Sequence, residues 1–254
     1  MILDKFKLDG KVALVTGASV GLGQGMAIAL AEAGADVACH CMFAGEADET
    51  CAMIEKLGRK AFSFVGDMSD KETPRRIVDE VVAKFGTIDI LVNNAGMIRR
   101  TPAVDFSEVD WSTVIEVNLS SVFRISQAAG RKMIEQGSGK IVNIASLLSF
   151  QGGITVPAYT ASKSGVAGLT KALANEWAKH NVNVNAIAPG YMATNNTTAL
   201  RADETRNRQI LERIPAGKWG TPEDLAGSVV FLASSASDYV QGHILVVDGG
   251  WMAR

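Results

Sequence analysis

The stretch KVALVTGASVGLG, residues 11–23, decides the fold of this chain. Residues 11–16 form the apolar run typical of a buried strand, and residues 21–33 have the Ala, Leu and Met content of a helix, which stops at Gly34. In the glycine-rich turn between them, the backbone must bend sharply and come close to a ligand. The N-terminus of the following helix offers free N–H groups and a partial positive charge, so the stretch predicts a site for a pyrophosphate group.

The alternation of strand and helix continues to the end of the chain. Further strands are expected at residues 36–40, 61–65, 88–92, 140–144, 182–187 and 244–247, and helices at residues 46–56, 70–85, 107–136 with a break, 159–179 and 222–234. The strands are near-continuous apolar runs, which is typical of parallel strands covered by helices on both faces. We therefore predict an α/β fold of the Rossmann type: a single doubly wound, mostly seven-stranded parallel sheet that binds ligands at the carboxyl ends of its strands.

The whole chain, residues 1–254, is expected to form one domain that binds a dinucleotide and carries the catalytic groups. No Pro- or Ser-rich linker and no charge block divides it, and its length is ordinary for an α/β domain. The long stretch without a predicted strand, about residues 189–221, is polar. A structureless loop of that length is more often a functional lid than a connector, so we expect it to be a substrate lid.

Composition and charge exclude several classes of function. The 25 Lys and Arg against 27 Asp and Glu give a formal net charge of −2, without the basic surplus of a nucleic-acid binder or a polybasic membrane protein. No apolar run reaches the length of a membrane span and no signal-peptide pattern is present, so a cytoplasmic location is expected. The three cysteines and three histidines have no ligand spacing, so no metal is expected.

Tyr159 and Lys163 are four residues apart and therefore lie on one face of a predicted helix. A phenol with a pKa of about 10 is a poor base at neutral pH, but a nearby ammonium group favours the phenolate, so the pair can act as an acid/base catalyst. Ser146 follows the strand at 140–144, and its hydroxyl could hydrogen-bond a substrate carbonyl oxygen beside the phenol. Taken alone this spacing occurs in many helices, and the alternative is a half-buried Tyr beside a solvated Lys.

Several motifs, in order and at matching spacings, resemble the short-chain dehydrogenase/reductase family over the whole chain. They are TGxxxGxG at 16–23, Asn93–Gly96 after the fourth strand, Asn118 in a helix, Ser146, Tyr159 with Lys163, and Pro189–Gly190 after the sixth strand. The resemblance implies that Tyr159 is the general acid/base and that Lys163 lowers its pKa and holds the nicotinamide ribose. It also implies that Ser146 orients and polarises the carbonyl, and that Asn118 anchors a water-linked proton relay to Lys163.

The resemblance further implies which residues bind the dinucleotide. The expected set is Gly17, Ser19, Gly21, Leu22, Gly23, Asp67, Met68, Asn94, Ala95, Gly96, Tyr159, Lys163, Pro189, Gly190, Met192 and Thr194. Within it, Asp67 is implied to contact adenine, Asn94 to lie beside the cofactor and Thr194 to lie near the carboxamide.

The choice between NAD and NADP depends on charges near the adenosine ribose. A ribose phosphate needs Arg or Lys nearby, but Val20 in the glycine loop is apolar, and the end of the second strand, residues 40–43, carries neither. The acid typical of NAD sites is also missing from that strand end, although Glu46 follows it. We predict NAD as the cofactor, with NADP less favoured.

Further segments resemble a subgroup of the family that exchanges a hydride between NAD and a deoxy-keto sugar acid in uronate (pectin-type) breakdown. They are residues 97–100, 149–153, 174–181, 191–197, 200–203 and 214–217. The implied substrate is 2-dehydro-3-deoxy-D-gluconate or 2,5-diketo-3-deoxygluconate. The residues expected to bind it are Arg99, Arg100, Ser146, Gln151, Tyr159 and Asn195. Guanidinium groups suit its carboxylate, although the alternative for the two arginines is a solvated turn with surface ion pairs.

Other functions remain as alternatives: a 3-oxoacyl-[acyl-carrier-protein] reductase, a gluconate 5-dehydrogenase-like enzyme, or a non-catalytic nucleotide sensor on the same fold. The first would need NADPH and a basic docking surface. The apolar Val20 offers no positive charge for the phosphate of NADPH, and the arginine pair is expected at the pocket and not on a docking surface. A sensor usually lacks the catalytic Tyr or Lys, whereas this chain keeps both.

The resemblance also implies a homotetramer. The apolar tail, residues 247–254, is expected to pack against another subunit, with Trp251 or Arg254 bordering the neighbour's active site.

Overall fold

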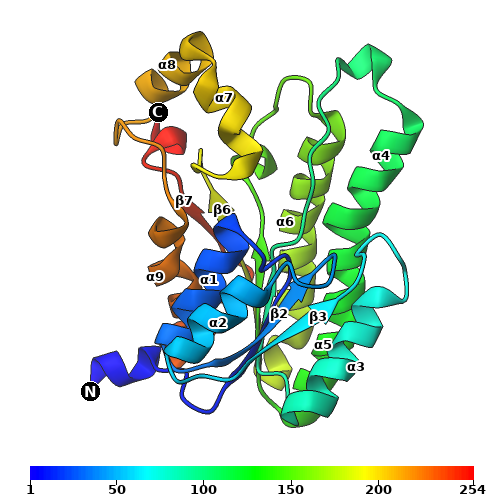
Figure 1. Cartoon of the computed structure of the whole chain (residues 1–254), viewed down its shortest axis with the longest axis vertical. Helices are drawn as coiled ribbons and strands as arrows, with labels where there is room; N and C mark the ends of the chain where they lie inside the picture. Colours follow the sequence, from blue (N-terminus) through cyan, green and yellow to red (C-terminus); the bar gives the residue numbers. More distant parts are fainter.

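A parallel sheet of seven strands lies at the centre of the computed structural model, which describes all 254 residues (Figure 1). The strands are β1 (Val12–Val15), β2 (Asp36–Cys41), β3 (Ala61–Val65), β4 (Ile90–Asn93), β5 (Gly139–Ile144), β6 (Val182–Pro189) and β7 (Ile244–Val247). Their order across the sheet is β3-β2-β1-β4-β5-β6-β7, so the winding direction switches between β1 and β4. The predicted α/β class and doubly wound parallel sheet are confirmed, and such a switch point is where these sheets bind ligands.

Helices cover both faces of the sheet. They are α1 (Gly21–Glu32), α2 (Asp48–Lys56), α3 (Thr73–Phe85), α4 (Glu108–Ile115), α5 (Ser121–Gln136), α6 (Pro157–Trp177), α7 (Thr198–Ala202), α8 (Glu204–Arg213) and α9 (Ala226–Ala233). One apolar cluster joins α1, α2 and α9 to the sheet, and a second joins α3, α5 and α6 to it (Figure 1). Every residue of β1, β4 and β6 is buried between these layers, which explains why the strands are apolar runs without alternation.

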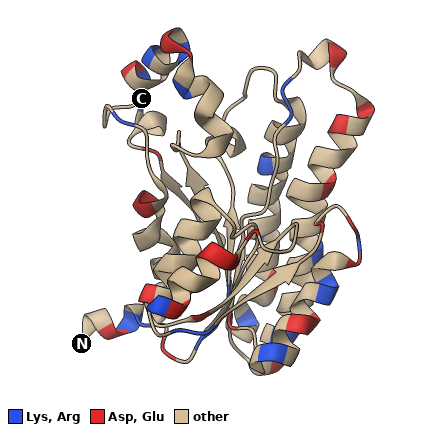
Figure 2. Ribbon diagram, viewed as in Figure 1, with Lys and Arg blue, Asp and Glu red and all other residues tan.

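Charged residues of both signs are interspersed along the helices, as the blue and red segments of the ribbon show (Figure 2). None of the helices combines the length and the apolar character needed to cross a membrane.

The predicted break in the helix at residues 107–136 is a single π-helical turn. Helix α4 passes into this turn at Glu116–Ser120, and the chain continues directly as α5. Such turns often accompany functional sites, because the extra residue in the turn redirects a side chain. Here the turn holds Asn118, whose side chain is buried.

The lid segment, residues 189–221, is not the structureless loop that its sequence suggests. After the end of β6 it forms a short 3-10 turn at Asn195–Thr197 and then the helices α7 and α8. Figure 1 shows α7 and α8 beyond one end of the sheet, close to the C-terminus. The position suits a cover over the strand ends, but its closure over a substrate remains a prediction.

The C-terminal tail packs against the lid segment of its own chain. Trp251 is only 5% exposed and belongs to one apolar cluster with Ile210 and Ile214. Its ring centroid lies 4.6 Å from that of Tyr191, and Arg213 lies over the indole at 3.9 Å. The expectation that this tryptophan needs another subunit to bury it is wrong, because α8 and the start of the lid segment already cover it.

Candidate active site

One cleft, with a volume of about 400 Å³, opens at the carboxyl ends of the central strands and gathers most of the predicted site. The predicted residues that line it are Gly17, Gly21, Leu22, Gly23, Asn94, Ala95, Gly96, Arg100, Tyr159, Lys163, Thr194 and Asn195. They come from the turn after β1, the turn after β4, helix α6 and the lid segment. Segments far apart in sequence therefore meet where the winding of the sheet switches.

The glycine loop between β1 and α1 requires glycine at defined positions. Gly17 and Gly21 have φ values of +64° and +60°, a region that other residues rarely adopt. A Cβ atom on Gly23 would overlap the carbonyl oxygen of Gly17. The N–H groups of Gly21, Leu22 and Gly23 at the start of α1 have no partner in the chain, and the N-cap, Val20, provides no side-chain acceptor. These donors are free to hold an anion such as a pyrophosphate.

Asn94 and Thr16 fasten the glycine loop to the end of β4. The side-chain amide of Asn94 donates to the carbonyl oxygens of Thr16 and Gly17 at 2.9 and 3.0 Å. The hydroxyl of Thr16 accepts hydrogen bonds of 2.9 Å from the backbone N–H groups of Asn94 and Ala95. The loop is therefore held in position by the neighbouring strand end before any ligand binds.

Tyr159 and Lys163 lie one turn apart near the start of α6. Lys163 is buried, and its Nζ donates a 2.6 Å hydrogen bond to the carbonyl oxygen of Ile144. Burial lowers the pKa of Lys163 to about 8. Burial raises the pKa of Tyr159, while a hydrogen bond with Ser146 and the positive charge of Arg100 act in the opposite direction.

The ammonium group of Lys163 makes its hydrogen bond to the sheet and not to the phenol of Tyr159. The Nζ atom lies 5.7 Å from the centroid of the phenol ring and directs its hydrogen bond to the backbone of β5. Ser146 and Arg100 are the groups that lower the pKa of this phenol, against the effect of its burial. The role of Lys163 in activating the tyrosine therefore remains a prediction.

Asn118 is locked to the chain segment that follows β4. Its Oδ1 accepts a hydrogen bond from the N–H of Met97, and its Nδ2 donates to the carbonyl of the same residue, both at 2.8 Å. The Nδ2 also lies 3.3 Å from the hydroxyl of Ser162 on α6. The side chain thus connects the π turn, the end of β4 and α6, with no direct contact to Lys163. The predicted water-linked relay is not tested by this geometry.

Three predicted substrate-binding residues are outside the cleft lining: Arg99, Gln151 and Ser146. The hydroxyl of Ser146 accepts a hydrogen bond of 3.2 Å from the backbone N–H of Leu148. The Nε of Arg99 forms an ion pair with Asp110 at 3.3 Å, so this arginine follows the surface alternative. The Oε1 of Gln151 accepts hydrogen bonds from Arg213 and from the indole of Trp251, both at 3.4 Å. Arg99 is therefore engaged at the surface, and Gln151 supports the contact between tail and lid segment.

Several predicted cofactor-binding residues also lie outside the cleft lining. Met192 and Gly190 line a neighbouring hollow of about 160 Å³, and Pro189 is the buried end of β6. Asp67 and Met68 follow β3 beside the glycine loop, where the carboxylate of Asp67 accepts from the N–H of Ser69 at 2.8 Å. Ser19 belongs to the glycine loop but not to the lining. Their contacts to a dinucleotide remain predictions.

Five cleft residues were missed by the sequence analysis: Val20, Met97, Ile98, Ile144 and Thr197. Met97 and Ile98 directly follow the NNAG motif, so their place in the sequence could have included them. Thr197 lies in the same turn as Asn195 and Asn196, both of which the sequence suggests as partners for substrate hydroxyls. Ile144 contributes a backbone carbonyl to Lys163, and no sequence signal identifies such a residue, because every residue has a carbonyl.

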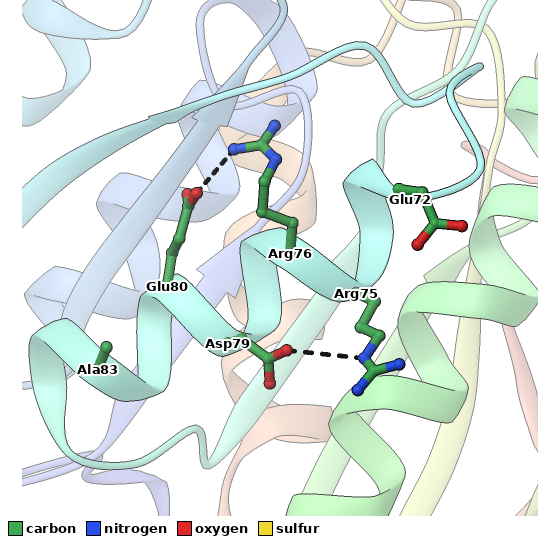
Figure 3. A pocket seen from close by; sticks show the side chains of 6 residues that line it. All are labelled: Glu72, Arg75, Arg76, Asp79, Glu80 and Ala83. Atoms are coloured by element: carbon green, nitrogen blue, oxygen red, sulfur yellow. Dashed lines mark hydrogen bonds and ion pairs between the residues drawn. The ribbon is translucent and has the colours of Figure 1, made fainter.

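A second hollow, of about 490 Å³, lies on the outer face of α3 and is lined by two ion pairs together with Glu72 and Ala83. Figure 3 shows Arg75 beside Asp79 at 3.7 Å and Arg76 beside Glu80 at 2.8 Å. These side chains are exposed, so the pairs contribute little energy and leave no reactive group aimed into the hollow. The cleft is therefore the candidate active site.

Comparison with known proteins agrees with this geometry. Residues 17–252 match a family model described as enoyl-(acyl carrier protein) reductase. The 2-dehydro-3-deoxy-D-gluconate 5-dehydrogenase of Dickeya dadantii is 60% identical over 255 residues, which cover 100% of both chains.

Two solved structures extend this likeness to three dimensions. A protein from Agrobacterium tumefaciens with bound NADP, described as a 2-deoxy-D-gluconate 3-dehydrogenase, is 56% identical, with a TM-score of 0.92 over 98% of this chain and 99% of that chain. A gluconate 5-dehydrogenase from Burkholderia cenocepacia, in complex with NADP and tartrate, is 40% identical, with a TM-score of 0.96 over 100% of both chains. The motifs, the sheet order and these matches lead to one conclusion: the chain belongs to the short-chain dehydrogenase/reductase family of NAD(P)-dependent oxidoreductases.

Proposed function

We propose that this enzyme transfers a hydride between a nicotinamide dinucleotide and a deoxy-keto sugar acid, 2-dehydro-3-deoxy-D-gluconate or its 2,5-diketo counterpart, in the breakdown of pectin-type uronates. The observation that carries the proposal is the 60% identity, over the full length of both chains, to an enzyme named for this substrate. The cleft supports it, because an acid/base pair and a cationic side chain line the same space.

The proposed chemistry assigns separate tasks to the residues around the phenol. The bound nicotinamide supplies or accepts the hydride. Tyr159 donates a proton to the carbonyl oxygen during reduction and takes it back during oxidation. Ser146 hydrogen-bonds the same oxygen, and its lowering effect on the pKa of the phenol supports that role. Lys163 binds the nicotinamide ribose, and Asn118 holds the segment after β4 that forms one wall of the cleft.

Arg100 is the residue proposed to bind the substrate carboxylate. It is the only arginine in the cleft lining, and its charge acts on the phenol of Tyr159. Asn195 and Asn196 line the same cleft and could hydrogen-bond the substrate hydroxyls. The tartrate bound to the Burkholderia cenocepacia relative is a hydroxy acid, which agrees with an anionic substrate of this kind.

NAD is the proposed dinucleotide, in preference to NADP. Val20 is apolar, and the carboxylate of Glu46 returns to the end of β2, where it accepts a hydrogen bond from the N–H of Phe43 at 3.0 Å. A carboxylate at this place favours a ribose hydroxyl and repels a ribose phosphate. Arg76 lies nearby but is engaged by Glu80 and by the carbonyl of Val65.

The dinucleotide preference is testable by comparing the two cofactors directly, since two solved relatives bind NADP. The proposal requires a higher kcat/KM with NADH than with NADPH. The variant Glu46→Gln should narrow this difference by weakening the repulsion of the phosphate. A wild-type preference for NADPH would contradict the proposal.

A cytoplasmic homotetramer is proposed as the working form. Helices α4 and α5 and the turn before them expose the large apolar side chains of Val104, Val109, Trp111 and Phe123. Exposed apolar groups concentrated on one part of a surface often mark a subunit interface. Light scattering at micromolar concentration should give four times the chain mass, and a monomeric mass would contradict the assembly.

An absorbance assay at the NADH band tests the proposed reaction. It compares 2-dehydro-3-deoxy-D-gluconate with D-gluconate and with an acetoacetyl thioester, each with NAD and with NADP. Alcohol groups are tested for oxidation with the oxidised dinucleotides, and keto groups for reduction with the reduced ones. The proposal predicts the highest kcat/KM with the deoxy-keto sugar acid. Preference for gluconate would favour the second candidate, a gluconate 5-dehydrogenase, which the likeness to the Burkholderia cenocepacia enzyme supports. Turnover of the thioester alone would favour an acyl-carrier-protein reductase. Nucleotide binding without turnover of any substrate would favour a sensor.

A further inference from the structure

His40 joins the glycine loop to the end of β3. It is the penultimate residue of β2, and its side chain is only 2% exposed. Its Nδ1 accepts a hydrogen bond from the backbone N–H of Gly17 at 3.2 Å, and its Nε2 lies 2.9 Å from the carbonyl oxygen of Gly66. A carbonyl can only accept a hydrogen bond, so Nε2 carries the proton and Nδ1 is the acceptor.

The backbone of His40 holds the same loop a second time. Its carbonyl oxygen accepts a hydrogen bond from the N–H of Ala18 at 2.9 Å. One residue therefore engages two successive donors of the glycine loop, those of Gly17 and Ala18. These two N–H groups are occupied, which leaves the donors at the start of α1 to bind the pyrophosphate.

The neutral form of the imidazole is the one that fits this position. Burial lowers the pKa of His40. An imidazolium would carry a second N–H at Nδ1, directed at the N–H of Gly17, and would lose the acceptor that the loop requires. The ring is also rigid, so its two nitrogens fix the separation of the groups that they contact.

Each end of this bridge belongs to a different half of the dinucleotide site. Gly17 begins the turn that faces the pyrophosphate, and Gly66 directly precedes Asp67, the residue expected to contact adenine. We propose that His40 is a positioning residue for the dinucleotide, which sets the glycine loop and the adenine-binding end of β3 in register with each other. This proposal rests on the dinucleotide binding of the proposed function and not on the identity of the sugar acid.

Three substitutions separate this role from ordinary core packing. His40→Asn places a side-chain oxygen near the position of Nδ1 and so can keep the contact with Gly17. His40→Gln places its amide near the position of Nε2 and keeps only the contact with Gly66. His40→Leu removes both contacts. The exposed His243, changed to Gln, serves as the control for histidine replacement.

The measurement is the dissociation constant of NADH and of NADPH, taken from nucleotide fluorescence without any substrate, together with Tm and kcat. A lost buried hydrogen bond corresponds to a weakening of about five- to tenfold, so His40→Leu and His40→Gln should raise Kd by about that factor. His40→Asn should stay within about twofold of the wild type. At saturating dinucleotide, kcat should be unchanged in all three, because His40 touches no reacting group.

The ranking of the variants decides the outcome. An unchanged Kd in a folded His40→Leu variant, with or without a lower Tm, would overturn the proposal. If that variant does not fold, the comparison of His40→Asn with His40→Gln decides. Equal Kd values of these two variants for the dinucleotide would also overturn the proposal. Because the titration uses no substrate, a failure of the sugar-acid proposal would leave this result readable.

Discussion

The ammonium group of Lys163 donates a hydrogen bond of 2.6 Å to the carbonyl oxygen of Ile144, at the carboxyl end of β5. This bond joins α6 to the sheet at the point where both residues line the cleft. It is the only hydrogen bond that the chain provides for a buried cation with three donors. Burial therefore still lowers the pKa of this lysine to about 8.

Protein stability should depend on pH through this lysine. Between pH values of about 8 and 10.5, the unfolded chain keeps a proton that the folded chain has released. The free energy of unfolding should therefore rise with pH in that window, by about 1.4 kcal/mol per pH unit. Below the window both states are protonated, so this pH dependence should vanish and the cost of burying the charged lysine is fully present. Urea unfolding at fixed protein concentration, from pH 7.5 to 10, compares the wild type with Lys163→Met. The free energy of unfolding of the wild type should increase relative to that of Lys163→Met as pH rises. Parallel pH dependences of the two proteins would contradict the lowered pKa of Lys163.

Removing the phenol of Tyr159 should stop catalysis without releasing the dinucleotide. In Tyr159→Phe the ring still fills its place, but no group can exchange a proton with the substrate carbonyl, so kcat should fall by a factor of about 10² to 10⁴. The Kd of NADH, measured by fluorescence, should change little. Tyr239 is fully exposed and its change to Phe is a matched control. Near-normal turnover in Tyr159→Phe would sink the proposed mechanism.

The two adjacent arginines should differ sharply in their effect on substrate binding. Arg100 lines the cleft, so Arg100→Gln should raise KM for the sugar acid by about 10- to 100-fold, the usual range for losing a charge-assisted hydrogen bond. Arg99 is half exposed and paired with Asp110, so Arg99→Gln should leave KM within about twofold. Steady-state kinetics at saturating dinucleotide measures both. Equal effects would remove Arg100 from its proposed role.

The glycine loop should tolerate no added methyl group at Gly23. In Gly23→Ala the new Cβ would overlap the carbonyl oxygen of Gly17, so the loop must shift and NADH binding should be lost or reduced at least tenfold. Gly168, an exposed residue of α6 with no atom near its Cβ position, provides the comparison. Gly168→Ala should bind NADH normally and melt at an equal or higher temperature, because alanine favours helix. A Gly23→Ala variant with wild-type affinity would show that the loop is not closely packed.

The strands could be predicted from sequence because each is a short apolar run bounded by turn residues. The run at residues 61–65 corresponds to β3 without change of bounds, and that at 182–187 corresponds to β6 with two further residues. The helices of the lid segment could not be predicted in this way. Helix α8 has a single buried residue, Ile210, so its sequence carries no apolar periodicity, and its packing depends on the distant Trp251.

The candidate site could be predicted only where the chemistry demands a particular residue. A phenol, an ammonium group and glycines at positive φ leave a mark in the sequence. Two adjacent residues of the same type cannot be told apart in this way. Arg99 and Arg100 are indistinguishable in the sequence, and only the fold brings Asp110 to Arg99. Gln151 is expected from the sequence to bind substrate, but tertiary packing gives it Arg213 and Trp251 as partners.

The aromatic contacts of the tail give the enzyme a built-in optical signal. Tyr191 lies between Trp219 and Trp251, with ring centroids 5.5 and 4.6 Å away, and the indole of Trp219 donates a 2.7 Å hydrogen bond to Asn207 on α8. Two of the four tryptophans thus sit at the base of the lid segment. Any rearrangement of α8 must alter the surroundings of these indoles. Unlabelled protein should therefore report the opening and closing of its own active site through ultraviolet emission, in real time and without a chemical probe.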